Sequence, residues 1–183
     1  PKIKDAWYQR RNDEIAALLV ENGFCKTRDE AHARVANMAI DPDRPMVALT
    51  FDDGPTQGVT NLILDALEQY NGRATFFVVG TRIAGSETLL KRAVSLGCEI
   101  GSHTWNHDTL TEISGESAAK SLRQTNDAVK AACGYTVRSL RPPKGLSNAQ
   151  VKELAGSMGL ALVFWNHSTH DYRLDSAQKI AGN

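Results

Sequence analysis

The stretch from Met46 to Pro55, MVALTFDDGP, decides the fold class, because an apolar run ends there in two acidic residues and a turn signal. The run from 46 to 51 has the length and composition of a buried strand. Gly54-Pro55 predicts the turn that ends it, and this turn lets the carboxylates of Asp52 and Asp53 enter one pocket. A solvated turn without chemistry is the alternative for this segment alone.

Strand-like and helix-like segments alternate along the chain after this stretch. Further short apolar runs, typical of buried strands, cover residues 74–79, 99–102, 136–140 and 160–165. Helical patterns between the runs cover residues 59–70, 87–96, 116–132 and 148–156. Repeated strand-helix units predict an α/β fold with a parallel sheet or a barrel. Because such folds bind ligands at the carboxyl ends of their strands, we expect the site there.

The first 45 residues predict a separate helical hairpin. Apolar spacing indicates a helix over residues 5–22 that stops at Gly23. Thr27 and Glu30 form a capping-box pattern that begins a second helix toward Met38, and the sequence DPDRP at 41–45 breaks it. We therefore divide the chain into an appendage, 1–45, which is expected to serve packing or docking, and a main domain, 46–183.

Two histidines four residues apart, His103 and His107, follow the apolar run 99–102. On a helix, or on its first turn, this spacing places both imidazoles on one face. Joined to Asp53, they supply a carboxylate and two imidazoles, a ligand set for a divalent cation such as zinc with a position left for water. Asp52 then remains available as a base. Chance proximity is the weaker alternative.

Composition narrows the partners. Lysine plus arginine equals aspartate plus glutamate at 21 each, so no net field favours nucleic acid or an anionic membrane, and a neutral substrate fits best. The length of 183 residues and 42% apolar content suit one domain with a small appendage.

No apolar stretch is long enough to span a bilayer, and no signal segment opens the chain. The widely spaced Cys25, Cys98 and Cys133 are expected to be reduced.

Three motifs in order resemble those of the polysaccharide deacetylases, the carbohydrate esterase family 4 or NodB homology domains. They are TFDDGP at 50–55, HTWNH at 103–107 and RPPKG at 141–145. The resemblance runs from Met46 to the end and implies a distorted (β/α) barrel. It implies removal of acetyl groups from N-acetylglucosamine units of peptidoglycan or chitin, or from acetylated xylan. The resemblance further implies a polysaccharide or oligosaccharide partner and a location outside the cytoplasm. It implies a divalent metal cofactor, with zinc expected and cobalt, nickel or manganese as alternatives.

The resemblance also assigns roles to individual residues. Asp52 matches the catalytic base, and Asp53, His103 and His107 match the metal ligands. Arg141 matches the arginine that pairs with the base, where a guanidinium would orient the carboxylate and keep it ionised.

The remaining motifs match less well. Lys144 stands where the family usually has an aromatic residue whose main-chain N–H faces the oxyanion. Asp171 occupies the position of an aspartate that tunes the catalytic histidine, and Tyr172 replaces a tryptophan. No counterpart of that histidine, the general acid, precedes Asn183, so we expect the sequence to be truncated. His167 or His170 as a substitute acid, and a silent relative that binds polysaccharide, are the alternatives.

Overall fold

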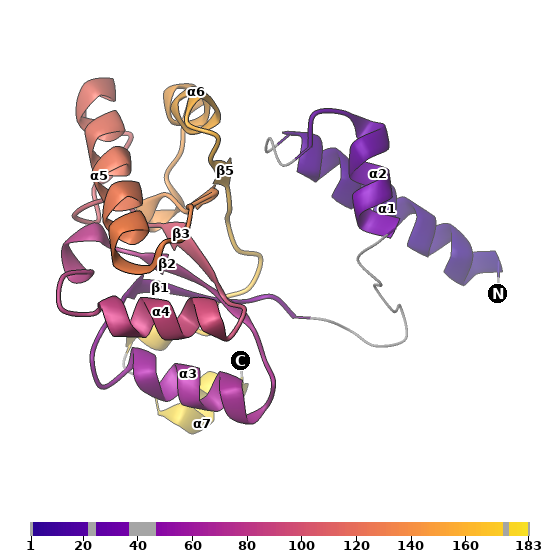
Figure 1. Ribbon diagram of the computed structural model, residues 1–183. Helices are drawn as coiled ribbons and strands as arrows, with labels where there is room; N and C mark the ends of the chain where they lie inside the picture. Colours follow the sequence, from indigo (N-terminus) through magenta and orange to yellow (C-terminus); the bar gives the residue numbers. More distant parts are fainter. Residues whose placement is uncertain (1, 22–24, 37–46, 174–175, 183) are drawn as a thin grey trace.

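The computed structural model describes residues 2–21, 25–36, 47–173 and 176–182. In these residues five parallel strands form one sheet in the order β1-β2-β3-β4-β5 (Figure 1). The strands are β1 (Leu49–Gly54), β2 (Ala74–Val78), β3 (Glu99–Ser102), β4 (Ser139–Leu140) and β5 (Ala161–Leu162). The α/β prediction is confirmed. Within the described residues the sheet is open rather than closed into a barrel.

A helix connects each strand to the next. These helices are α3 (Thr60–Gln69), α4 (Glu87–Ser95), α5 (Gly115–Cys133) and α6 (Ala149–Ser157). Short helices follow β2, β4 and β5: η1 (Gly80–Arg82), η2 (Pro143–Gly145), η3 (Asp171–Arg173) and α7 (Ala177–Gly182). The predicted strands and helices are therefore all present. β5 is shorter than the predicted run, and beyond it the carbonyls of Val163 and Phe164 accept hydrogen bonds from the Arg141 side chain.

The main core lies between the sheet and these helices. Alternate strand residues, among them Phe76, Val78 and Ile100, are buried in it. Phe77, between two of them, points to the other face of the sheet, where its ring lies under the Arg141 guanidinium, 4.2 Å from the centroid. Gly101 leaves room for that ring, since a Cβ there would lie 2.4 Å from Phe77 Cδ1. The sheet thus offers one apolar face to the helices, and the Arg141 guanidinium lies on the other face.

The predicted helical hairpin is confirmed as α1 (Lys2–Glu21) and α2 (Arg28–Ala36). The two helices contact each other and share a small core of buried residues, which are Ala16, Cys25, Ala31 and Val35. Glu30 N–H donates to Thr27 Oγ1, as a capping box requires. The Glu30 carboxylate accepts from Lys26 N–H, one residue before the Thr27 N–H that the motif usually uses. The predicted break at 41–45 lies outside the described residues, and the division at residue 45 stays a prediction.

All three cysteines are free, as predicted; Cys25 and Cys98 are buried and Cys133 is half-buried. None of the described helices combines the length and the apolar character needed to cross a bilayer.

Candidate metal centre and catalytic groups

The end of β1 turns both aspartates toward the carboxyl edge of the sheet. Pairing with β2 is regular up to Phe51 and shifts before Gly54, and Asp53 between them has a φ of 65°. The Gly54–Pro55 peptide bond is cis. Arg82 donates to the Asp53 carbonyl, and Val79 N–H donates to the Gly54 carbonyl at 2.9 Å, so η1 and the residue before it hold the turn. The strand alternation that would separate the two carboxylates is broken at the position where the sequence predicts a turn.

The two histidines lie on a loop, so the helical explanation of their spacing is wrong. Residues 103–107 follow β3 without helical hydrogen bonding, and Thr104 and His107 have φ values of 69° and 56°. His103 N–H still donates to the Val78 carbonyl at 2.9 Å, which keeps this residue in line with the sheet. The left-handed residues then turn the chain back, and the two imidazole centroids come within 5.1 Å. A looped backbone achieves the convergence that a helix was expected to provide.

Asp53, His103 and His107 form one cluster of potential metal ligands. Their ligand atoms all lie within 4.8 Å of one another, and Asp53 Oδ1 is 3.5 Å from His103 Nε2 and 3.4 Å from His107 Nε2. The His103 side chain is 3% exposed, whereas those of His107 and Asp53 are 40% and 56% exposed. One carboxylate and two imidazoles fit a divalent cation, and the exposed side leaves access for water and substrate. The predicted metal ligands are thus brought together.

The surroundings of His103 favour its ligand form. Its Nδ1 lies 2.7 Å from the Arg141 carbonyl, which can only accept, so Nδ1–H donates and Nε2 presents a lone pair toward Asp53. Burial lowers the pKa of the His103 imidazole, because the charged form loses hydration, while the charge of Asp52 opposes this shift. A neutral imidazole with a fixed tautomer is the form that binds metal.

Asp52 is held beside the cluster by a buried arginine. Arg141 is 3% exposed, and its Nη1 donates to Asp52 Oδ1 at 2.7 Å and to Thr50 Oγ1 at 2.8 Å. Nε and Nη2 donate to the carbonyls of Val163 and Phe164 at 3.3 and 3.2 Å. An ordinary surface ion pair is therefore excluded for Arg141. Sequence reasoning missed Thr50 and the two carbonyls, and backbone acceptors leave no signal in side-chain identity.

The other predicted residues are less closely tied to the cluster. Lys144 is exposed, has a φ of 60°, and its N–H has no acceptor among the described residues. Asp171 accepts from Thr169 Oγ1 at 3.4 Å, and within the described chain no hydrogen bond joins it to the other predicted site residues. His167 and His170 are exposed, and His170 Nδ1 lies 3.1 Å from the Tyr172 hydroxyl. The roles of Lys144 and Asp171 stay predictions.

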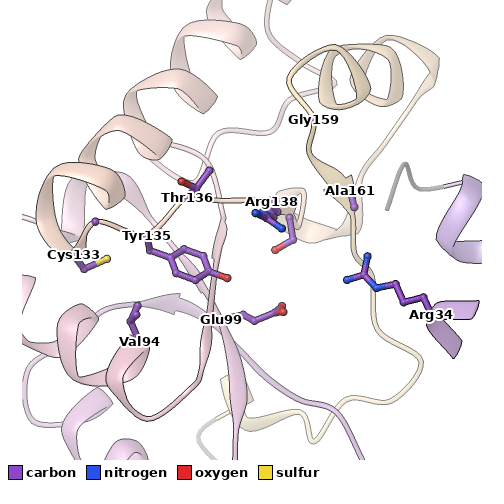
Figure 2. Close-up of a pocket in the computed structure, with 11 residues that line it drawn as sticks. Arg34, Val94, Glu99, Cys133, Tyr135, Thr136, Arg138, Gly159 and Ala161 are labelled. Carbon is purple, nitrogen blue, oxygen red and sulfur yellow. The ribbon is translucent and has the colours of Figure 1, made fainter. Parts of the chain in front are cut away.

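A separate cavity lies at the opposite edge of the sheet. It has a volume of about 640 Å³, and its walls include Glu99, Ser139 and Ala161, which begin β3, β4 and β5 (Figure 2). Tyr135 and Arg138 also line it. Burial, together with the charge of Glu99, raises the pKa of the Tyr135 hydroxyl. Because the ligand cluster lies at the other, carboxyl edge, this cavity is not part of the candidate site.

The ordered motifs and this geometry agree with the comparison with known proteins. A profile of the family described as polysaccharide deacetylase matches residues 39–163, which is more than half of the chain. This chain belongs to the polysaccharide deacetylase family. It is 36% identical over 148 residues to peptidoglycan-N-acetylmuramic acid deacetylase PdaC of Bacillus subtilis, covering 81% of this chain and 31% of PdaC. It is 39% identical over 131 residues to peptidoglycan-N-acetylglucosamine deacetylase PgdA of Listeria monocytogenes, covering 72% and 28%.

The fold of this family member agrees with a solved structure as well. The structure of PdaC from Bacillus subtilis superposes with a TM-score of 0.72 at 37% identity, covering 78% of this chain and 69% of that chain. The family resemblance and the α/β architecture predicted from the sequence are therefore confirmed. The chain spans about three-tenths of the length of the two curated relatives.

Proposed function

We propose that this chain is the catalytic part of a metal-dependent hydrolase that removes N-acetyl groups from polysaccharide containing N-acetylglucosamine, of the peptidoglycan or chitin type. The convergence of Asp53, His103 and His107 beside an Asp52 carboxylate held by Arg141 carries the proposal. The names of both curated relatives describe peptidoglycan deacetylases, which supports this substrate class. Since these polymers lie outside the cytoplasm, we also propose that the protein acts there.

In this proposal one group of residues binds the metal and a second group transfers the proton. Asp53, His103 and His107 would hold the divalent ion, and zinc suits their mixture of one oxygen and two nitrogen donors. Cobalt, nickel or manganese would also be accepted, since availability as well as affinity decides occupancy. When bound, such an ion supplies a Lewis acid that polarises a carbonyl oxygen and acidifies a water molecule.

Asp52 is placed to accept a proton from the water that attacks the acetyl carbon. Arg141 holds one carboxylate oxygen, Oδ1, so the other oxygen is left to receive the proton. The family resemblance adds the Lys144 N–H as a donor to the developing oxyanion. Cleavage of the C–N bond, with one water consumed, yields acetate and a free amine on the sugar.

The test separates metal binding from proton transfer. Purified protein is stripped with a chelator, titrated with zinc or cobalt, and assayed for acetate release from acetylated chito-oligosaccharide. Asp53→Ala and His103→Ala should abolish stoichiometric metal binding. Asp52→Asn should keep the metal but lose at least about 100-fold in turnover, because it cannot accept a proton. Asp127→Ala, which changes an exposed aspartate on α5, is the control and should do neither.

Three outcomes would change the proposal. Equal loss of metal in the Asp52, Asp53 and His103 variants would contradict the division of roles. Metal binding without acetate release, also from a version extended past Asn183, would favour a catalytically silent relative that binds polysaccharide. Faster release from acetylated xylan than from chitin oligomers would make the substrate an O-acetyl ester.

A further inference from the structure

The loop that carries His107 is attached to helix α5 by one buried hydroxyl. Ser121, 6% exposed, lies on α5 fourteen residues after His107. Its Oγ accepts from Trp105 N–H at 2.8 Å and donates to Asp108 Oδ2 at 2.5 Å. A single side chain on a rigid helix therefore holds the loop on both sides of the histidine.

Asp108 extends this attachment to the residues next to the ligand. Its Oδ2 also accepts from Asn106 N–H at 3.3 Å, and its own N–H donates to Thr104 Oγ1 at 2.7 Å. His107 stands between Asn106 and Asp108, so the carboxylate bound by Ser121 fixes both neighbours of the ligand. The left-handed φ of 56° at His107 is unfavourable for a residue with a Cβ and persists only where its surroundings hold it.

The two histidine ligands differ in how they are held. His103 is buried, its N–H is paired with β2, and its Nδ1–H donates to the Arg141 carbonyl. The His107 side chain is 40% exposed, so packing restricts it less and its direction depends on the loop backbone. The hydrogen bonds around Asp108 determine that backbone.

We propose that Ser121 is a positioning residue for the metal centre. Its hydroxyl orients Asp108, which fixes the loop so that His107 faces Asp53 and His103 before a metal binds. Ser121 touches neither metal nor substrate in this role. The inference rests on the proposed metal site and adds a helix residue outside the three motifs.

Replacing Ser121 tests this role through metal affinity. Ser121→Ala removes the acceptor of Trp105 N–H and the donor to Asp108, and it should weaken zinc binding about 10- to 100-fold, the range found for residues that orient metal ligands. Affinity is measured by competition with a chelating dye, and the absorption bands of bound cobalt report ligand geometry. Ser121→Cys, which keeps a weak donor in a similar volume, should fall between wild type and alanine.

Thr125→Val is the matched control. Thr125 is one turn further along α5, is fully buried, and donates only to the Ser121 carbonyl at 2.9 Å among the described residues. The Thr125→Val substitution removes a buried hydroxyl from the same helix. It should leave zinc affinity within about threefold of wild type, since the hydrogen bonds from Ser121 to the loop remain. Thermal unfolding of the metal-free variants shows whether each remains folded.

The possible results separate this inference from the proposed function. A wild-type protein that binds no zinc or cobalt defeats the metal centre itself. Wild-type binding with an unchanged Ser121→Ala affinity and cobalt spectrum overturns the role of Ser121 and leaves the proposed function standing. Should Ser121→Ala fail to fold, Asp108→Ala breaks the same connection from the loop side and must show the loss; an unchanged affinity there also overturns the inference.

Discussion

Replacing Arg141 with methionine should destabilise the metal-free protein by about 3 kcal/mol. Methionine keeps an apolar stem near Phe77 but removes every donor of a side chain that is 3% exposed. The bonds to Asp52 and Thr50 are short, at 2.7 and 2.8 Å, whereas those to the carbonyls of Val163 and Phe164 are longer, at 3.3 and 3.2 Å. The short bonds therefore carry most of the loss.

Solvent reduces the share that belongs to Asp52. Its side chain is 31% exposed, so water rehydrates the carboxylate once the guanidinium is gone. We expect a coupling of about 1 kcal/mol between the two residues, well below the 3–5 kcal/mol typical of breaking a fully buried pair. The remainder reflects the lost hydrogen bonds to the hydroxyl of Thr50 and to the two carbonyls.

Urea unfolding in the presence of a chelator measures both quantities. The free energy of unfolding is compared among wild type, Arg141→Met, Asp52→Ala and the double variant, which closes a cycle. Arg138→Met, which changes an exposed arginine three residues earlier, is the control and should stay within about 0.5 kcal/mol of wild type. If Arg141→Met loses no more stability than the Arg138→Met control, or if the coupling energy is zero, the buried network inferred from the structure is refuted.

Two further predictions concern packing and pH. Gly101→Ala should cost about 1–3 kcal/mol of unfolding free energy, because its Cβ would lie 2.4 Å from Phe77 Cδ1 and 2.8 Å from Ser139 Oγ. Gly156→Ala, in open space on α6, should instead stabilise the protein by about 0.5–1 kcal/mol. Equal effects of the two substitutions would contradict this prediction. Burial lowers the pKa of His103 in the folded protein, so below the ordinary value of 6.5 the unfolded chain binds a proton more readily than the folded one. The free energy of unfolding is therefore highest above that pH and decreases as the pH falls below it. Thermal unfolding of metal-free protein from about pH 7.5 to 5.5 should show this loss and a flatter profile for His103→Gln; identical profiles would oppose it.

The sequence pattern predicts the order of the elements well because burial imposes its periodicity locally. The run that ends in Asp52 and Asp53 forms β1, and the histidine motif follows β3, so the shared edge of a parallel sheet suffices to predict that these groups meet. Backbone conformation is less accessible. The left-handed residue His107 lies in a loop held by hydrogen bonds of Ser121 and Asp108, and the polar identities of these two residues alone do not indicate those bonds.

Arg141 shows why residue type and backbone position must be considered together. Its guanidinium holds Asp52, the proposed base, while its main-chain carbonyl accepts from Nδ1–H of His103, a proposed ligand. The side chain alone predicts the first contact, and only the register of β4 beside β3 supplies the second, since Arg141 N–H donates to the Ser102 carbonyl at 3.0 Å. Arg141→Met therefore removes the support of the base but retains the carbonyl that fixes the ligand. One residue at the end of β4 thus aligns by independent means the proposed base, which lies on β1, and a proposed metal ligand, which follows β3.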